Sequence, residues 1–266
     1  GCAQRYLTHD ALNAIYQSTW RMTDADGALE YHDRFLTYLH AIQKADLTLG
    51  VAMTDAKGDR SLRPHKQTNP DTYVHVKERR SDGIVIRGTK AIVTGGPYMH
   101  ELLVMPCRTM TSSDADFAVC CAVPLDAAGL TIISKVAGRP GEEEAKFSAK
   151  YGQSTAVCQF HDVFVPWDRV FMAGEWEHTE HLVTSYANHH RQSCIGARAG
   201  FGDLLIGAGA LMTEANGLDT ESVPHLRDDM VDLIKIVEGF YACGVASSVY
   251  GVQDLAGSYM PEPVFS

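Results

Sequence analysis

The sequence contains little positive charge and no long apolar run. Its 23 lysine and arginine residues are outnumbered by 33 aspartate and glutamate residues, which gives a net charge of −10 at pH 7. Such an acidic chain lacks the basic surface that attracts nucleic acids and anionic membranes, so we expect neither as a partner. The longest apolar candidate, residues 204–212, is much shorter than the roughly 18 residues that a membrane helix needs. We therefore expect no membrane segment.

Cysteine is present without the paired spacing of a disulfide framework or a zinc site. The seven cysteines are scattered, their number is odd, and no signal-peptide pattern is visible. This usage predicts reduced thiols in a cytoplasmic protein. The chain begins at Gly1, inside a helical pattern, and not at Met. We therefore expect a piece of a longer protein.

The periodicity of the apolar residues changes twice along the chain. With 45% hydrophobic and 21% charged residues, the composition is that of a folded globular protein of one or two domains. Apolar residues recur at helical spacing up to about residue 45, in short β-branched runs to about residue 170, and at helical spacing afterwards. We predict an α+β protein with a helical part (1–45), an antiparallel β-barrel or sandwich (46–170) and a second helical part (171–266).

The middle part contains several strand signals. Ser81-Asp82-Gly83 lies between two β-branched runs and predicts a hairpin turn. Further strands are expected over residues 102–105, 117–123, 130–133 and 157–165. The stretch Arg139–Lys150, rich in Gly, Glu and Lys, is predicted to be an exposed loop.

Two long helices are expected in the last part. The first, over residues 181–215, contains several glycines, each of which costs about 1 kcal/mol relative to alanine. Close helix packing or the close approach of a cofactor would explain so many. The second helix is expected over residues 226–255, opened by Pro224 and broken near Gly244.

Two segments of the middle part have the character of ligand-binding turns. Residues 52–61 combine a hydroxyl, a glycine and a run of polar side chains, and such a turn offers backbone N–H groups to a ring edge or a phosphate. Residues 88–96 end in Thr94-Gly95-Gly96, which lets the backbone approach a ligand closely. Composition alone favours a solvated connection for the first segment and equally fits an ordinary strand end for the second.

A third segment lies on the helix expected over residues 181–215. His190 and Cys194 are four residues apart and share a helix face. Two such ligands are only half of a metal site, and a pair of this kind more often serves packing than metal binding. Arg191 and Arg198 add positive charge nearby. A histidine beside an arginine is also suited to bind an anionic oxygen.

Together these segments resemble the 4-hydroxybutyryl-CoA dehydratase/4-hydroxyphenylacetate 3-monooxygenase family, and the dehydratase branch more closely. The resemblance extends over nearly the whole chain and rests on five ordered matches: Asp10–Ala14, Ala52–Ser61, Asp82–Gly88, His190–Ser193 and Gly202–Ala208. It implies the acyl-CoA dehydrogenase architecture, in which a C-terminal helical bundle forms tetramers. It also implies that further segments of the whole protein lie outside this chain.

The resemblance implies FAD as the cofactor. It assigns the flavin loop to Met53, Thr54, Asp55, Lys57, Gly58, Asp59 and Arg60. It places Thr94 near the reactive part of the isoalloxazine ring. A flavin needs hydrogen bonds at its polar ring edge and a dry apolar wall, which strand ends and a β-sheet can supply.

The dehydratase branch also binds a four-iron cluster through three cysteines and a histidine. Cys2 and His190 fall on two of these ligands, whereas Tyr6 and Ala197 stand at the other two positions. Because an alanine methyl group cannot bind iron, the resemblance predicts a protein without an iron–sulfur cluster, in which Cys2 and His190 are the retained half of the site.

The catalytic positions of the two branches are also changed. Cys194, Thr155 and Arg198 stand where the dehydratase has a catalytic tyrosine, glutamate and lysine. The monooxygenase branch needs no metal, takes reduced flavin from a separate reductase and hydroxylates a phenol. Tyr6 falls on a tyrosine of its substrate pocket, but Val51 stands in place of its histidine.

Three hypotheses follow from this pattern. The first is an FAD-dependent, monooxygenase-like oxidoreductase that acts on a small phenolic or acyl-CoA substrate, in which Tyr6 and His190 face the flavin and Arg198 holds an anionic or carbonyl oxygen. The second is a 4-hydroxybutyryl-CoA dehydratase/vinylacetyl-CoA isomerase with a degenerate cluster site that recruits Cys194. The third is a non-catalytic paralogue in a mixed oligomer. For the first we expect a homotetramer served by a flavin reductase.

Overall fold

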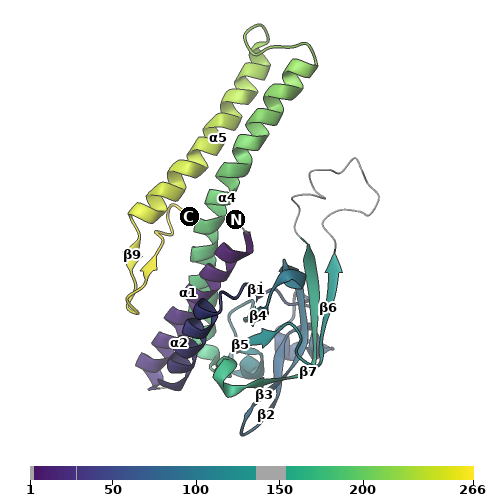
Figure 1. Cartoon of the computed structure of the whole chain (residues 1–266), viewed down its shortest axis with the longest axis vertical. Coiled ribbons are helices and arrows are strands. Elements are labelled where there is room, and N and C mark those ends of the chain that lie inside the picture. Colours follow the sequence, from purple (N-terminus) through teal and green to yellow (C-terminus); the bar gives the residue numbers. More distant parts are fainter. Residues whose placement is uncertain (1–2, 28, 136–153) are drawn as a thin grey trace. The chain divides into compact units, whose positions relative to one another are not determined.

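The computed structural model describes residues 3–27, 29–135 and 154–266. The chain divides into two compact units, Gly1–Tyr186 and Ala187–Ser266. The first unit contains two helices and two β-sheets, and the second contains a pair of long helices followed by a short β-hairpin (Figure 1). Helix α4 (Thr179–Ala215) begins in the first unit and continues into the second. The loop predicted at 139–150 lies outside the described residues.

Two four-stranded sheets form the middle of the first unit. The first sheet has the order β1-β4-β5-β8, with β1 (Leu49–Ala52), β4 (Glu101–Val104), β5 (Val119–Pro124) and β8 (Val170–Ala173). The second has the order β2-β3-β7-β6, with β2 (His75–Arg79), β3 (Gly83–Thr94), β6 (Leu130–Lys135) and β7 (Thr155–Pro166). The predicted turn at 81–83 is confirmed as the β2–β3 connection.

The first sheet is buried on both of its faces. Along β4, Leu102 and Val104 point into a core shared with the second sheet, whereas Leu103 points into a core shared with the helices. The adjacent thiols of Cys120 and Cys121 on β5 divide in the same way, as the period of two requires. Burial raises the pKa of both thiols. Both cysteines therefore pack as small apolar residues.

The two sheets form an open sandwich. Among the described residues, the strand pairings keep the sheets separate, and no ladder closes them into the predicted barrel. The expectation of antiparallel strands is wrong for one pair, because β1 and β4 run parallel, with Leu49 opposite Glu101. The physical reason is the connection between them, which crosses to the second sheet for β2 and β3 before it returns to the first.

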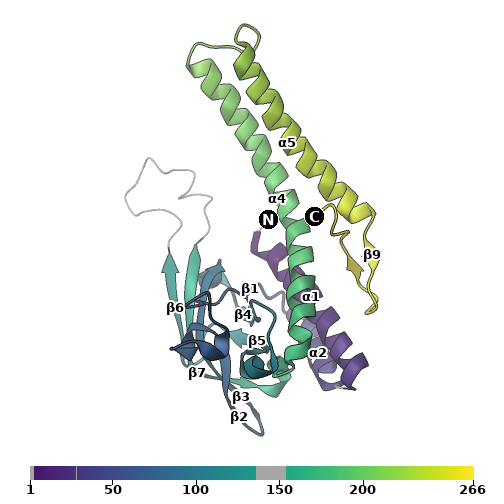
Figure 2. The same ribbon diagram turned by 180° about the vertical axis from the view of Figure 1, so that it is seen from behind.

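Helices α1 (Ala3–Asp26) and α2 (Leu29–Lys44) confirm the helices predicted before residue 45. They pack on the outer face of the first sheet, as Figure 2 shows from behind. The ring of Phe35 meets Phe171 edge-on at a centroid distance of 5.3 Å, and Tyr38 lies 5.2 Å from the same ring. Such aromatic pairs add about 0.5–1.5 kcal/mol to the burial of their apolar surface.

The second unit consists of the rest of α4, helix α5 (Pro224–Val249) and a hairpin of β9 (Val252–Gln253) and β10 (Tyr259–Met260). The expected break near Gly244 and the helix end near residue 255 are wrong. A Cβ at Gly244 would lie 2.9 Å from Cγ2 of Ile195, so this glycine permits close packing without interrupting the helix. Gly202 has the same role opposite Val237, where a Cβ would lie 2.4 Å away.

One helical stretch, Trp176–Ala215, is long and apolar enough by length and composition to cross a membrane. This finding differs from the sequence expectation, because a window average tolerates the polar residues that interrupt a continuous apolar run. A single such helix is weak evidence, since core helices of other proteins pass the same test.

Candidate functional site

The loop assigned to the flavin leaves the end of β1 and is fastened to β3. The backbone N–H of Ala56 donates to the Thr89 carbonyl at 3.1 Å, and Ala91 donates to the Thr54 carbonyl at 2.8 Å. These two bonds frame an isolated bridge between Asp55 and Lys90. The first turn of the loop is therefore an extension of the second sheet.

The Lys90 ammonium group holds this junction together. It lies 2.8 Å from Oδ1 of Asp55 and donates to the carbonyls of Met53 at 2.9 Å and Met105 at 2.7 Å. An ammonium group has three N–H donors, so all three are used. Both side chains of the pair are almost fully buried. The geometry joins the ends of β1 and β4 to β3 through one cation.

Asp55 is therefore a structural anchor. Its carboxylate faces Lys90 and accepts a further bond from the backbone N–H of Val74 at 2.9 Å. The structure turns this side chain, which the sequence assigned to the cofactor, towards the interior. Its carboxylate therefore fixes the backbone of the loop from inside the protein.

The tip of the loop is exposed and internally braced. Gly58 has a φ of +52°, and a Cβ there would lie 2.5 Å from Oε1 of Gln67. The amide of Gln67 accepts from the Asp59 N–H and donates to the Asp59 carbonyl. Bonds from Ser61 hold the pKa of Asp59 below its ordinary value. Asp59 and Arg60 are exposed at this tip, and Lys57 is half-buried.

A second buried carboxylate holds the far side of the loop. Asp114, in η4 (Ser112–Phe117), is fully buried and accepts bonds from Nδ1 of His65 at 2.6 Å and from Nε of Arg63 at 3.0 Å. Thr111 donates two further hydrogen bonds to the same carboxylate, one from its backbone N–H and one from its hydroxyl. Burial alone would raise the pKa of Asp114, but the bonds from His65, Thr111 and Arg63 outweigh it and lower the pKa well below its ordinary value.

Sequence reasoning missed the structural roles of Lys90 and Asp114, the two buried charged residues that hold the loop. A detectable signal existed for Lys90, because it occupies an inward position of β3 in phase with Ile84 and Ile86, where a charge is unexpected. Thr111 and Asp114, three residues apart, form a capping box. This pattern predicts the start of a helix and gives no sign that Asp114 also anchors a distant loop.

Thr94 is the last residue of β3 and lies beside β7 in the second sheet. Its register partner on β7 is Thr155, which the resemblance predicted to stand in place of the dehydratase glutamate. Both threonines are partly exposed, whereas Val93 and Ala156 are buried in the core between the sheets. The structure thus brings together two hydroxyl-bearing positions that the sequence placed on separate segments.

The second unit carries the remaining described site residues on one face of α4. The Sγ of Cys194 lies 3.6 Å from Nε2 of His190, which confirms that the two side chains meet. Arg198 follows after one further turn and is exposed. Ala197 is adjacent to Arg198 and half-buried. The side chain of Tyr6, in α1, and the residue Cys2 lie outside what the structure describes.

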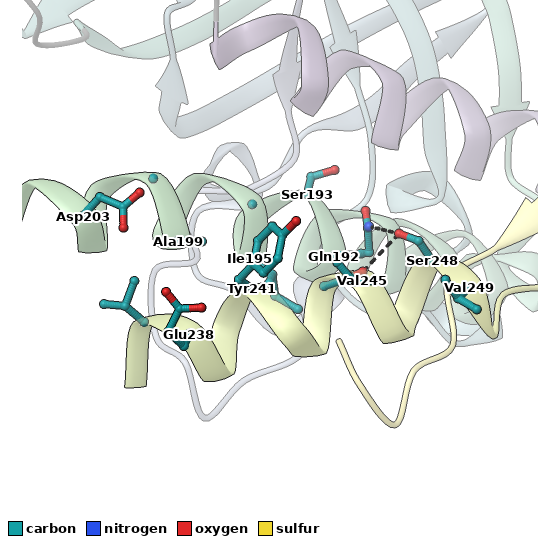
Figure 3. Close-up of a pocket in the computed structure, with 14 residues that line it drawn as sticks. Gln192, Ser193, Ile195, Ala199, Asp203, Glu238, Tyr241, Val245, Ser248 and Val249 are labelled. Carbon is teal, nitrogen blue, oxygen red and sulfur yellow. Dashed lines mark hydrogen bonds between the residues drawn. The ribbon is translucent and has the colours of Figure 1, made fainter. Parts of the chain in front are cut away.

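A groove of about 790 Å³ lies on another face of α4, between this helix and α5 (Figure 3). It is lined by small residues such as Gly196 and Ala199 and by the polar pair of Gln192 and Ser248, joined at 2.7 Å. His190, Cys194 and Arg198 do not line it. The groove is therefore separate from the residues assigned to chemistry.

Ligand-type side chains do not gather into a metal site among the described residues. No group of three or more His, Cys, Asp or Glu side chains in residues 3–27, 29–135 and 154–266 has the arrangement to hold a metal ion. His190 and Cys194 supply two candidate ligands at most within this part of the chain.

Comparison with protein families decides the assignment. Residues 1–172 match the family model described as 4-hydroxyphenylacetate 3-hydroxylase N terminal, and residues 179–266 match the model for its C terminal part. The chain belongs to the 4-hydroxyphenylacetate 3-hydroxylase family. This match confirms the resemblance seen in the sequence.

Two curated relatives represent the two branches of this family. The chain is 39% identical over 264 residues to 4-hydroxybutyryl-CoA dehydratase/vinylacetyl-CoA-Δ-isomerase of Clostridium aminobutyricum, covering 97% of this chain and 53% of that protein. It is 24% identical over 257 residues to the 4-hydroxyphenylacetate 3-monooxygenase oxygenase component of Thermus thermophilus, covering 95% and 52%. The chain spans about half the length of the relatives that it matches.

Solved structures of this family share the fold. An archaeal 4-hydroxybutyryl-CoA dehydratase from N. maritimus superposes with a TM-score of 0.91 at 34% identity, over 99% of this chain and 53% of that one. An oxygenase component of 4-hydroxyphenylacetate 3-monooxygenase, complexed with FAD, gives 0.85 at 21% identity, over 98% and 54%. The acyl-CoA dehydrogenase of Geobacillus kaustophilus gives 0.52 at 15% identity over 75% of this chain and 48% of that one, which supports the predicted architecture at the level of fold.

Proposed function

We propose that this chain is part of an FAD-dependent, monooxygenase-like oxidoreductase that acts on a small phenolic or acyl-CoA substrate without an iron–sulfur cluster. One observation carries the proposal: strand β3 supplies both Lys90, which anchors the loop assigned to the flavin, and Thr94, which is assigned to its ring. The two segments assigned to the flavin, residues 52–61 and 88–96, are thereby attached to one strand.

The residues present fit a flavin. Thr94, a partly exposed residue, provides a hydroxyl as a hydrogen-bonding group, and the braced loop presents Lys57 and Arg60 for the anionic part of the cofactor. Two buried carboxylates hold this loop in place before any ligand arrives, which lowers the ordering cost of binding. When bound, FAD supplies the redox chemistry of its isoalloxazine ring.

The proposed roles of the protein side chains are limited to binding and proton transfer. His190 holds or moves a proton at its imidazole, Tyr6 offers a phenolic hydroxyl, and Arg198 binds an anionic or carbonyl oxygen. An arginine remains charged, so Arg198 is suited to orient a substrate and unsuited to act as a base. Ala197 and Tyr6, in place of sulfur ligands, support the absence of a cluster.

A second candidate is the dehydratase/isomerase reaction with an unusual cluster site. It is supported by the 3.6 Å contact of Cys194 with His190, which offers a thiol and an imidazole side by side. The relative at 39% identity carries this activity in its name.

The test is the absorption spectrum, with iron and sulfide analysis, of the full-length protein purified without oxygen. Flavin without iron, followed by turnover of a phenol or an acyl-CoA with a reductase present, would support the proposal. Flavin with about four irons per subunit would replace it with the dehydratase, and Cys194→Ser would then lower the iron content. If the protein shows neither flavin nor iron, even after incubation with FAD, the non-catalytic paralogue is the hypothesis that is left.

The assembly of the protein is part of the same proposal. We propose a homotetramer, since α4 and α5 expose large apolar side chains such as Leu205, Leu211 and Ile236. A cytoplasmic location is supported by the free cysteines among the described residues. A membrane role for α4 is disfavoured by Arg191, Arg198 and Asp203 within the helix. The division at residues 45 and 170 and the C-terminal bundle remain predictions.

A further inference from the structure

Ile92 has an unusual backbone for its residue type. Its φ is +60°, in the left-handed region that a β-branched residue rarely adopts because its Cβ substituents crowd the backbone. The strand register skips here, from Lys90 opposite Cys158 to Val93 opposite Ala156, so Ala91 and Ile92 form a bulge. The conformation costs free energy that the surrounding sheet must supply.

The bulge does not serve to bury the side chain. Ile92 is 69% exposed, although Lys90 and Val93, the paired residues on either side of the bulge, are buried. A glycine or an asparagine would fit the same backbone with less strain, and would expose less apolar surface. Neither folding nor solvation therefore accounts for isoleucine at this position.

The outer face of the sheet continues the apolar surface of Ile92. On β7, Ala156 and Cys158 point into the core, so Val157 between them points outward, opposite the bulge. Its register partner on β6 is Ile133, which is 53% exposed. Ile92, Val157 and Ile133 thus form an apolar row across three adjacent strands.

This apolar row lies beside the threonine pair. The next outward positions are Thr94 on β3 and Thr155 on β7, which are register partners of each other. In the described part of the first unit, the exposed large hydrophobic side chains are Ile92, Tyr98, Ile133 and Phe164. Three of these four belong to β3, to the turn that follows it or to β6, so the exposed apolar surface is concentrated next to Thr94.

We propose that the bulge holds Ile92 outward as an apolar contact for the isoalloxazine ring of FAD, with Val157 and Ile133 continuing the surface. This inference rests on the proposed function. An apolar row bordered by hydroxyl groups matches a planar ring that has an apolar face and a polar edge. Ile92 is a binding residue in this assignment, and its strain is stored in the protein before the ring arrives.

The test compares stability with cofactor affinity in the full-length protein. Ile92→Gly removes the side chain and also removes the strain, because glycine adopts a positive φ freely. We expect the melting temperature of the apoprotein to stay unchanged or to rise, while the Kd for FAD, measured by quenching of flavin fluorescence, rises roughly tenfold through the lost apolar contact.

Two further variants serve as controls. Ile92→Val keeps most of the apolar surface and should bind FAD nearly as well as the unchanged protein. Asp46→Gly relieves another left-handed residue, with a φ of +52° at the end of α2, and should leave the Kd for FAD unchanged.

Each outcome separates the inference from the proposed function. A weaker Kd without loss of stability supports the contact. An unchanged Kd in Ile92→Gly overturns it, including the case in which only substrate binding is weakened, which would assign Ile92 to the substrate. A fall in both affinity and melting temperature overturns it in favour of a structural role. If the unchanged protein binds no FAD at all, the proposed function fails together with the inference.

Discussion

The two units of the chain differ in how they dispose of their apolar side chains. The first unit has two cores, one between the sheets and one between the first sheet and the helices. The second unit, all of whose residues are described, buries the hydrophobic side chains of only Ile195, Val237 and Ala256. Its contacts between α4 and α5 depend instead on glycines that let the helices approach. The first unit is stabilised by its own interior, whereas the second presents apolar surface for other protein elements to cover.

The largest effect is expected from the buried cation of the first unit. Lys90→Met leaves the Asp55 carboxylate buried without its partner, which should destabilise the protein by about 3–5 kcal/mol. The measurement is the denaturant midpoint of the first unit, followed by hydrogen exchange in β1, β3 and β4. Lys77→Met is the matched control, because its ion pair with Asp162 is exposed and is worth about 0–1 kcal/mol. Equal effects of the two variants would show that Lys90 is not an anchor.

The second carboxylate predicts a dependence on pH. The folded-state pKa of Asp114 lies below its ordinary value. The stabilisation is therefore fully present above the unfolded-state pKa of about 4 and is lost as the pH falls below it. Asp114→Asn should cost about 2–3 kcal/mol at pH 7, since hydrogen bonds to a charge are replaced. The gap in melting temperature between the two proteins should begin to narrow as the pH falls below about 5, and it should continue to narrow below about pH 3 because the folded-state pKa lies well below the ordinary value. A constant gap would contradict the assignment.

An intermediate effect is expected at the helix contact of the second unit. Gly202→Ala introduces a methyl group where Val237 already lies, and should cost about 1–3 kcal/mol. Gly207→Ala is the control, because no neighbouring atom lies within 4 Å of its Cβ position, and it should stabilise the helix by up to about 1 kcal/mol. Hydrogen exchange in α4 and α5 measures both. Recovery in the double variant Gly202→Ala/Val237→Ala would identify the methyl contact as the cause.

The smallest effect on folding, and the most informative one on assembly, concerns an exposed leucine. Leu211 on α4 is 67% exposed, so Leu211→Gln should change the stability of a single copy by no more than about 0.5 kcal/mol. If copies of the chain cover this surface, the variant should shift the full-length protein towards smaller assemblies in light scattering. Lys235→Gln, an exposed polar change on α5, is the control. An unchanged assembly would place Leu211 outside the interface.

Local sequence patterns predicted most elements, because periodicity reports which face of an element is buried. The β-branched run Ile84-Val85-Ile86 predicted β3, and the helical spacing before residue 45 predicted α1 and α2. The effect of Gly244 was not predictable, since a glycine that breaks a helix and one that admits a neighbour look alike until Ile195 is in place. The parallel pairing of β1 with β4 depends on a connection through the other sheet, which leaves no local signal.

The sequence predicted which segments contribute to the candidate site, but not the directions in which their side chains point. The sequence placed Thr94, His190 and the loop after residue 52 among the site residues, and the structure shows Cys194 in contact with His190. It also assigned Asp55 to the cofactor, whereas that side chain faces Lys90. The direction of a side chain depends on its partner across the fold, and the partner lies 35 positions along the chain.

The parallel β1–β4 pair has a consequence for the order in which the chain folds. The β2–β3 hairpin joins residues separated by a short turn, and hairpins of this kind form within about 1–10 μs. Residues 49 and 101, and residues 119 and 173, meet only after long loops have closed, so the first sheet is assembled from distant segments. Such topologies fold slowly, because the entropy of loop closure is lost before the contacts form. The hairpin therefore serves as an early template, and the completion of the first sheet sets the pace at which the chain becomes native.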